Sequence, residues 1–195
     1  MSKTDATASH KPRADRNRLV SIIKERSFQN GPEMKLASGR SSTFYFNMKP
    51  TMLHPEGAYL IGSLVLDTVA DSPADFVGGL EMGAVPIATS ACTVSHARGI
   101  PLPAFFVRKQ AKEHGTQSLI EGLPRGETLA GKRVVLVEDV TTTGGSALKA
   151  AQAVRDAGGV IVSVVTVVDR LEGAAEAFKA AGLPFHPILT LDDFR

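Results

Sequence analysis

Two adjacent carboxylates, followed by a loop rich in hydroxyls and glycines, form the strongest chemical signal in the chain. Glu138 and Asp139 come directly after the apolar run of residues 134–137. The loop that follows consists of Val140, Thr141, Thr142, Thr143, Gly144, Gly145 and Ser146. Its glycines let backbone N–H groups approach a ligand closely, its hydroxyls donate hydrogen bonds, and the N-terminus of a following helix attracts an anion. The segment therefore predicts a cradle for one phosphate monoester.

The acidic pair needs a partner other than the phosphate, because two carboxylates beside a phosphate would repel it. They suit the hydroxyl groups of a ribose, or a hydrated Mg²⁺ that bridges to pyrophosphate. The alternative is an ordinary strand–turn–helix connection in which Thr or Ser caps the helix. A Walker loop is excluded because no lysine follows the glycines, and a dinucleotide fingerprint is excluded by the glycine spacing. A sugar phosphate is the ligand that fits best.

A cluster of cations forms the second signal. Arg108 directly follows a predicted strand, and Lys109, Lys112 and His114 come within the next six residues, before Gly115. Such a cluster could clamp a pyrophosphate group and stabilise the charge that builds on it as it leaves. His114 could also exchange a proton near neutral pH. Taken alone, the same string would fit a solvated basic turn.

A third group of residues could bind a planar ring that carries a carboxylate. Tyr45 and Phe46 belong to an aromatic run beginning at Phe44, and on a strand Tyr45 faces away from the other two. One aromatic face could stack on a base, although core packing is the alternative for each ring. Arg170 ends a long apolar strand and could pair with a ligand carboxylate in two-point fashion. The alternative for Arg170 is a surface ion pair with Asp169.

Strands and helices alternate along the chain in a way that would place these residues together. Helices are predicted at residues 15–25, 55–70, 84–98, 146–157 and 174–181. Strands are predicted at residues 34–37, 43–48, 76–79, 104–107, 133–137, 160–168 and 187–189, with a loop between Pro50 and Pro55. The alternation predicts an α/β fold with a Rossmann-like central parallel sheet flanked by helices. Ligands of such folds bind beyond the carboxyl ends of the strands.

Composition limits the class of protein. The chain has 195 residues, of which 43% are hydrophobic and 22% charged, and its net charge of +2 is too small to indicate a nucleic-acid partner. Its single cysteine, Cys92, permits no internal disulfide. No apolar run is long enough to cross a bilayer, and the first residues lack the apolar region of a secretory signal. We expect a cytoplasmic protein with no membrane partner, a disordered N-terminus at residues 1–15, and one domain at residues 16–195.

Residues 134–146 resemble the phosphoribosyl pyrophosphate motif of the type I phosphoribosyltransferases. The resemblance implies their fold, a Rossmann-like sheet with a small N-terminal hood, here at about residues 16–50. It implies that Glu138 and Asp139 contact the ribose hydroxyls and that residues 141–145 hold the 5-phosphate. It further implies Mg²⁺ as cofactor, bound through the substrate with a possible contact to Asp139.

Residues 108–115 resemble the catalytic loop of the orotate phosphoribosyltransferases, which reads R-K-x-x-K-x-[HY]-G. The resemblance covers residues 17–194. It implies transfer of the phosphoribosyl group to orotate in pyrimidine synthesis, with Lys109, Lys112, His114 and Asp139 in catalysis, and Arg108 also on phosphoribosyl pyrophosphate. Orotate is expected at Thr142, Arg170, Tyr45 and Phe46. In that enzyme the loop is mobile and crosses a dimer interface, which implies a homodimer whose Lys109 serves the neighbouring subunit.

Two positions depart from the pattern of that family. Ala37 and Gly83 stand where many members have lysine, which puts one contact to the base and one to pyrophosphate in doubt. Two alternatives therefore remain open: a phosphoribosyltransferase for another base, such as a purine, and a non-enzymatic regulator that senses phosphoribosyl pyrophosphate. The regulator would need a basic surface for RNA or DNA outside the site.

Overall fold

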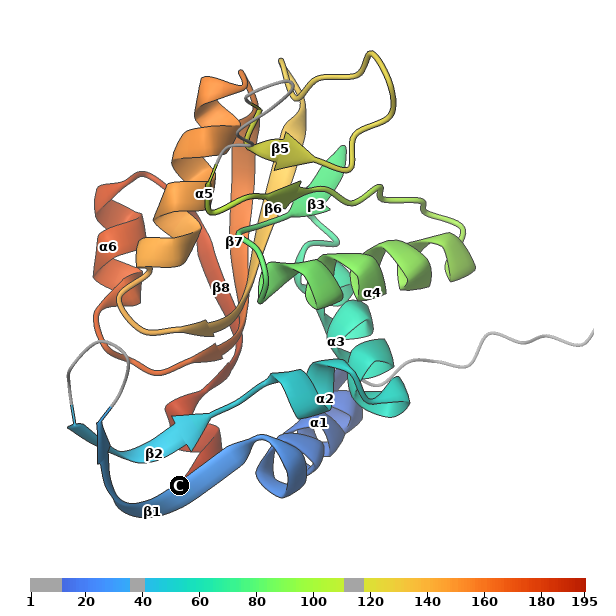
Figure 1. Cartoon of the computed structure of the whole chain (residues 1–195). Helices are drawn as coiled ribbons and strands as arrows, with labels where there is room; N and C mark the ends of the chain where they lie inside the picture. Colours follow the sequence, from blue (N-terminus) through green and yellow to red (C-terminus); the bar gives the residue numbers. More distant parts are fainter. Residues whose placement is uncertain (1–11, 36–40, 111–117) are drawn as a thin grey trace, which may run out of the picture.

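A four-stranded parallel sheet forms the centre of the molecule (Figure 1). The computed structural model describes residues 12–35, 41–110 and 118–195. The strands lie in the order β3 (Phe76–Gly78), β6 (Arg133–Thr141), β7 (Val160–Asp169) and β8 (Phe185–Thr190). All three pairings are parallel, as the alternation of strands and helices predicted. Their carboxyl ends therefore meet at one edge of the sheet.

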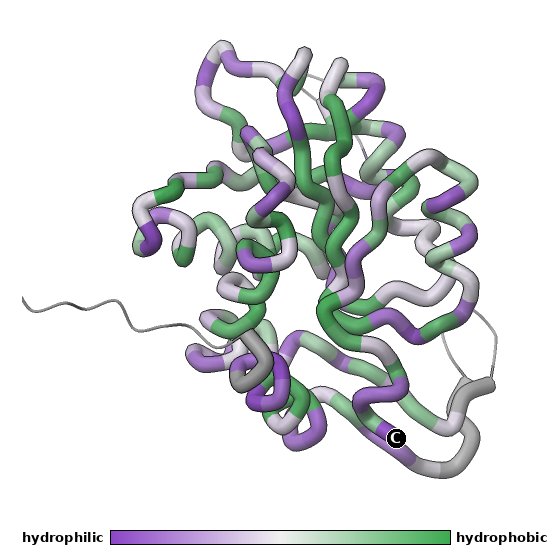
Figure 2. Tube along the Cα trace, turned by 180° about the vertical axis from the view of Figure 1, so that it is seen from behind, coloured by the Kyte–Doolittle hydropathy of each residue, from purple (hydrophilic) through white to green (hydrophobic). Residues whose placement is uncertain are grey.

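Helices cover both faces of this sheet, because each buried strand is apolar on both sides. On one face lie α3 (Pro55–Thr68) and α4 (Ala84–Ala97), and on the other α5 (Gly145–Asp156) and α6 (Ala174–Ala180) (Figure 1). Val135 and Val137 of β6 pack into the first hydrophobic cluster, whereas Val134 and Leu136 pack into the second. Figure 2 shows the hydrophobic colour running along the central strands, with hydrophilic residues toward the periphery.

A small antiparallel pair of strands forms the hood below the carboxyl edge of the main sheet (Figure 1). It consists of β1 (Phe28–Lys35) and β2 (Ser41–Phe46), preceded by α1 (Pro12–Arg26). Phe28, Phe46 and Phe194 pack together, with ring centroids 5.0 to 5.5 Å apart. Phe194 belongs to the last short helix, η1 (Leu191–Phe194), so the end of the chain fixes the hood to the main body.

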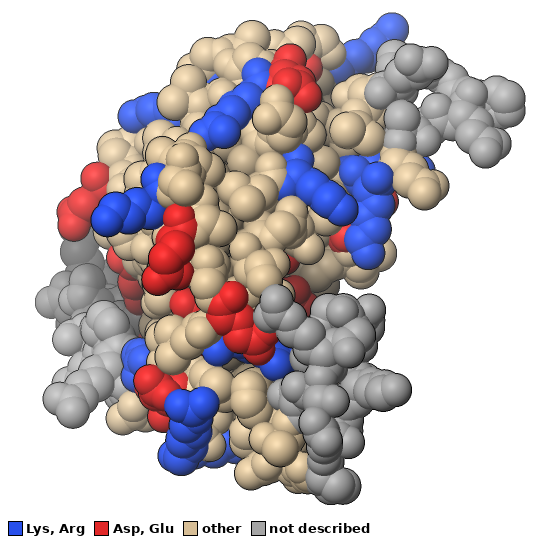
Figure 3. Space-filling view, turned by 90° about the vertical axis from the view of Figure 1, so that its left-hand side faces the viewer, with Lys and Arg blue, Asp and Glu red and all other residues tan. Residues whose placement is uncertain are grey.

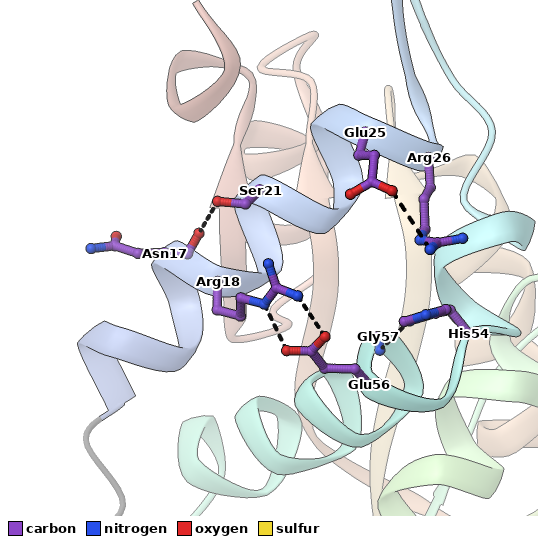
Figure 4. A network of polar contacts seen from close by, with 8 residues as sticks. All are labelled: Asn17, Arg18, Ser21, Glu25, Arg26, His54, Glu56 and Gly57. Carbon is purple, nitrogen blue, oxygen red and sulfur yellow. Dashed lines mark hydrogen bonds and ion pairs between the residues drawn. The ribbon is translucent and has the colours of Figure 1, made fainter.

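The ionic contact between α1 and α3 adds a second attachment (Figure 4). Arg18 donates from Nε and Nη2 to the two carboxylate oxygens of Glu56, at 2.6 and 2.7 Å. Glu56 lies in the first turn of α3, and the ring of His54 caps that helix by accepting from the N–H of Gly57 at 3.4 Å. Both Arg18 and Glu56 are exposed, so the pair contributes orientation more than stability.

Several predicted boundaries were wrong. The first helix begins at Pro12, and strand β1 begins at Phe28 rather than at Met34, because its backbone pairs with β2 from Phe28 onward despite polar side chains. Residues between Pro50 and Pro55 were expected to be a loop, but α2 (Lys49–Met52) lies there, with Pro50 in its first turn where a missing N–H costs nothing.

Strand β6 is longer than predicted and reaches Thr141, so the acidic pair sits in the strand itself. The strand expected at residues 104–107 is split. Ala104 bridges to Val77, while β4 (Phe106–Val107) pairs with β5 (Ile120–Glu121). None of the helices in the described part of the chain is long and apolar enough to cross a membrane. Some predictions concern positions outside the described residues: the N-terminal residues 1–11, Ala37, Lys112, His114 and Gly115.

Candidate active site

A cleft of about 320 Å³ opens at the carboxyl edge of the sheet. Its lining comes from segments far apart in the sequence: α2, the loop after β3, the start of the basic segment, the end of β6 and the start of α5. The polar residues among them are Lys49, Glu81, Lys109, Glu138, Asp139 and Ser146. The fold thus brings the acidic pair and the first lysine of the basic segment into one cavity, as the sequence predicted for chemistry beyond the strand ends.

Burial raises the pKa of both acidic residues. The pKa of Glu138 rises to about 7, mainly through burial and then through the neighbouring Asp139, although the Ser146 hydroxyl and the Ala147 N–H donate to it. Its Oε2 atom has no hydrogen-bond partner in the described structure. A buried acceptor of this kind costs free energy unless a donor reaches it. Glu138 is therefore suited to receive a hydrogen bond from a sugar hydroxyl.

Asp139 is the member of the acidic pair on which the cations of the cleft act. Burial raises the pKa of Asp139, while the backbone N–H groups of Val140 and Asp139 itself oppose the rise. The positive charges of Lys49 and Lys109 oppose it further. Two lysines from separate segments thus act on one carboxylate, which places the cleft's positive charge beside Asp139.

The phosphate loop turns into α5 through a glycine with a left-handed backbone conformation. Gly144 has a positive φ of 82°, and a Cβ atom there would lie 2.9 Å from the Phe178 ring. Both the backbone conformation and the lack of space therefore disfavour any side chain at this position. Helix α5 begins immediately after Gly144, so the N–H groups of its first turn lie at the loop, and that of Ala147 donates to Glu138. The buried hydroxyl of Thr141 donates to Thr166 Oγ1 at 2.8 Å, which fixes the first residue of the loop to β7.

The loop of residues 80–83, after β3, packs directly against the acidic pair. A Cβ atom at Gly83 would lie 2.5 Å from Asp139 Oδ1, so glycine lets the loop approach that carboxylate. Glu81 donates its backbone N–H to the Val107 carbonyl at 2.8 Å and accepts from the Lys109 N–H through Oε1, also at 2.8 Å. The loop therefore holds the backbone of Lys109 at the cleft.

Of the basic segment, Arg108 and Lys109 lie within the described residues. The Lys109 side chain is exposed and lines the cleft. Arg108 instead donates from Nε to the Gln110 carbonyl at 3.1 Å and lies 3.9 Å from Glu121 of β5. The structure thus brings Lys109 to the site, while Arg108 is engaged at its margin.

Arg170 lies at the end of β7, and the alternative of a surface pair with Asp169 is wrong. Only 6% of Arg170 is exposed, its ion pair is with Glu172 at 2.7 Å, and its guanidinium lies over the Phe44 ring. Asp169 instead accepts from the Leu171 N–H at 2.9 Å, and burial raises its pKa. The Arg170 N–H donates to the Thr141 carbonyl, so its backbone is tied to the phosphate loop.

The side chains of Tyr45 and Phe46 lie on opposite faces of β2, as strand alternation requires. Tyr45 is 41% exposed, whereas Phe46 is 6% exposed and packs in the aromatic cluster with Phe28 and Phe194. The structure therefore places the Phe46 ring in core packing, the alternative that the sequence left open for it. Any contact of Phe46 with a base would use its backbone.

Sequence reasoning missed three residues of this region. Phe44 was treated as part of an aromatic run, and Lys49 and Glu81 were given no role. A signal existed for Phe44, because it shares the face of Phe46 on a strand. For Lys49 and Glu81 the sequence holds none, since their place depends on segments that meet only in the folded chain.

One face of the molecule is mixed in charge. On the face shown in Figure 3, Lys and Arg are interspersed with Asp and Glu, in keeping with the net charge of +2. The regulator considered from the sequence would use a continuous basic surface. This face offers a mixed one.

Comparisons with known proteins show the family of the chain. The family model "Phosphoribosyl transferase domain" matches residues 53–181. An orotate phosphoribosyltransferase of Bradyrhizobium diazoefficiens is 59% identical over 181 residues, which cover 93% of this chain and 96% of that protein.

Two crystal structures of the orotate phosphoribosyltransferase of Mycobacterium tuberculosis are also similar. The complex with Fe(III) dicitrate has a TM-score of 0.80 at 45% identity and covers 92% of this chain and 98% of that one. The complex with 5-phospho-α-D-ribosyl 1-diphosphate has a TM-score of 0.75 at 38% identity and covers 96% and 94%. By the family model and by identity over nearly its whole length, the chain belongs to the orotate phosphoribosyltransferases of the type I phosphoribosyltransferase family.

Proposed function

We propose that the chain transfers the phosphoribosyl group of phosphoribosyl pyrophosphate to a ring nitrogen of orotate. The products are orotidine 5′-monophosphate and pyrophosphate, in pyrimidine nucleotide synthesis. One observation carries the proposal: the acidic pair, the phosphate loop and the buried Arg170 meet at one edge of the sheet. The 59% identity of the chain to an orotate phosphoribosyltransferase supports the proposal.

The phosphate loop is the proposed site of the 5-phosphate. The N–H groups at the start of α5 and the hydroxyls of Thr142, Thr143 and Ser146 would donate to its oxygens. Glu138 and Asp139 would accept from the ribose hydroxyls, with the unpartnered Oε2 of Glu138 as one acceptor. Two anchored ends fix the anomeric carbon between them, which lowers the entropy cost of reaching the transition state.

Pyrophosphate is the leaving group, and its departure needs positive charge. The bond between the anomeric carbon and the pyrophosphate oxygen breaks, its electrons go to that oxygen, and a ring nitrogen of orotate forms the new bond. Charge on the ribose resembles that in glycoside chemistry. Lys109 supplies a cation at the cleft. Lys112 and His114 are proposed to follow it in the same role, and they lie outside the described residues.

Mg²⁺ is the cofactor proposed with this substrate. Asp139 is a hard oxygen ligand at the cleft, and the small, open site leaves room for a metal that keeps water and phosphate oxygens as its other ligands. The donor set present therefore fits Mg²⁺. When bound, the ion would neutralise charge on pyrophosphate. Asp139 would hold it, or its water, at the edge of the sheet.

Orotate is proposed to lie toward the hood. Arg170 would pair with its carboxylate, and Thr142 and the exposed Tyr45 would border the ring. The proposal also includes a homodimer whose basic segment, residues 108–115, is shared between the sites of the two subunits. It further includes a single domain at residues 16–195 with its hood, and a cytoplasmic location. Both substrates are charged and cross a bilayer poorly, which favours the last of these.

The test follows the absorbance of orotate after mixing with phosphoribosyl pyrophosphate, Mg²⁺ and protein. We expect a decrease that requires all three additions and is lost in Lys109→Ala. Faster turnover of a purine base than of orotate would overturn the choice of base. Binding of phosphoribosyl pyrophosphate with no turnover of any base would favour a regulator.

A further inference from the structure

The cleft gathers positive charge from two separate segments. Among its described lining residues the cations are Lys49 and Lys109, which face the carboxylates of Glu81, Glu138 and Asp139. A pyrophosphate group carries several negative charges, so its binding needs cations within reach of its oxygens. Lys109 already has a place in the proposed reaction. Lys49 has none, although it lines the same cavity.

Helix α2 is held rigidly, so it presents Lys49 from a fixed base. Met48 and Met52 are buried in the hydrophobic core at 1% and 3% exposure. The buried hydroxyls of Thr51 and Ser27 are 2.6 Å apart and hydrogen-bonded, which ties α2 to the end of α1. Lys49 itself is exposed. Its backbone is thus fixed while its ammonium group is free to meet a ligand in the cleft.

The loop on the opposite wall of the cleft cannot carry such a charge at its closest point. A side chain at Gly83 would collide with Asp139, because a Cβ atom there would lie 2.5 Å from Oδ1. That wall therefore offers backbone groups, and a cation must come from elsewhere. Lys49 lines the same cleft as Gly83, so a side chain from α2 can supply the positive charge that this position lacks.

The geometry points to Lys49 as a binding residue for the pyrophosphate group, reaching across the cleft from α2 toward the loop of residues 80–83. The inference rests on the proposed function. It adds the Lys49 ammonium group as the contact that holds the leaving pyrophosphate on the hood side. Lys49 would act with Lys109, one from each side of the cavity. A lysine suits this role because it neutralises charge without a fixed hydrogen-bond geometry.

The test is calorimetric titration of the purified chain with inorganic pyrophosphate, and separately with phosphoribosyl pyrophosphate, both at fixed Mg²⁺. In Lys49→Gln we expect Kd for both to rise about tenfold, the loss typical of one charge-assisted contact. Lys49→Arg should stay within about threefold of the parent. The difference in Kd between Lys49→Gln and the parent should shrink at high salt, because salt screens exposed charges.

Lys132→Gln is the matched control, since Lys132 is exposed and precedes β6 at the opposite edge of the sheet. It should leave both Kd values unchanged. Unchanged binding in Lys49→Gln, while the parent turns over orotate, would overturn the inference and leave the function standing. Binding that depends on Lys49 in a protein that does not turn over orotate would support the inference and overturn the function. A parent that binds neither probe would overturn both.

Discussion

The guanidinium carbon of Arg170 lies 4.7 Å from the centre of the Phe44 ring. This contact joins the end of a central strand, β7, to the hood strand β2. Arg170 also pairs with Glu172 at 2.7 Å, so its side chain is held from two sides and buried. A buried cation fixed in this way is prepared to meet a ligand carboxylate with little loss of side-chain entropy.

Replacing Arg170 with glutamine should reduce kcat/KM for orotate by about 100-fold, because a charge-assisted contact to the orotate carboxylate is lost. Binding of phosphoribosyl pyrophosphate should change little. Glu172→Gln is the control, since it breaks the ion pair and keeps the guanidinium. Steady-state kinetics with each substrate varied would measure both. Equal losses for the two substrates would show that Arg170 supports the whole site instead.

Phe44→Leu should raise KM for orotate about fivefold while keeping the apolar bulk at that position. The reason is the loss of the ring face beneath Arg170, worth about 1 kcal/mol. Phe28→Leu is the matched control, because Phe28 packs in the aromatic cluster with Phe46 and Phe194. It should lower Tm and leave KM for orotate unaltered. Steady-state kinetics and thermal unfolding of both variants distinguish an effect on KM from an effect on Tm. An unchanged KM in Phe44→Leu would contradict the prediction.

Gly144→Ala should destabilise the protein by about 2 kcal/mol or more, because it combines a positive φ of 82° with a Cβ atom 2.9 Å from the Phe178 ring. Gly182→Ala is the control for backbone strain alone, since its φ is 68° and nothing lies within 4 Å of the added atom. Gly182→Ala should lower the free energy of unfolding by about 1 kcal/mol. Urea unfolding would compare the two, and equal losses would show that Phe178 moves aside freely.

Much of this site could be predicted from local sequence. The order of strand, acids, hydroxyls, glycines and helix predicted the phosphate loop, and the structure confirms the strand before it and the helix after it. These features depend on backbone conformation within a few residues of each other. Local chemistry therefore suffices to predict them.

The residues that were missed depend on contacts between distant segments. Phe44 and Arg170 are joined only when the hood folds against β7, and Lys49 meets Gly83 only across the cleft. Strand β1 was largely missed because its backbone pairing with β2 holds it, while its sequence is polar with Gly31 and Pro32 inside. Periodicity of apolar residues cannot detect a strand of this kind.

Thr166→Val should cost about 1 to 2 kcal/mol of unfolding free energy, because the buried Thr141 hydroxyl loses its acceptor at 2.8 Å. Ser163→Ala on the same strand is the matched control. Within the described structure the buried Ser163 Oγ has no hydrogen-bond partner, so its removal should be neutral or stabilising. Denaturant unfolding measures both variants. Equal destabilisation would mean that the Thr141–Thr166 contact contributes nothing.

Stability should fall as pH rises between about 4.5 and 7, and Glu138 should account for a large part of the fall. Burial raises the pKa of Glu138 from 4.5 to about 7, so between those values the folded chain binds more protons than the unfolded chain. The free energy of unfolding then decreases with pH, by on the order of 2 kcal/mol across the window. Asp139 shifts in the same direction and adds to the slope.

Glu138→Gln stays neutral at every pH and should flatten this slope, leaving the variant more stable than the parent above pH 7 by about the same amount. Glu127→Gln is the control, since Glu127 is exposed on a loop. It should retain the slope of the parent. Urea unfolding from pH 5 to 8 provides the measurement. A parent whose stability rises over that range, or a Glu138→Gln variant with an unchanged slope, would show that Glu138 is charged throughout and that its burial is offset by groups near the cleft.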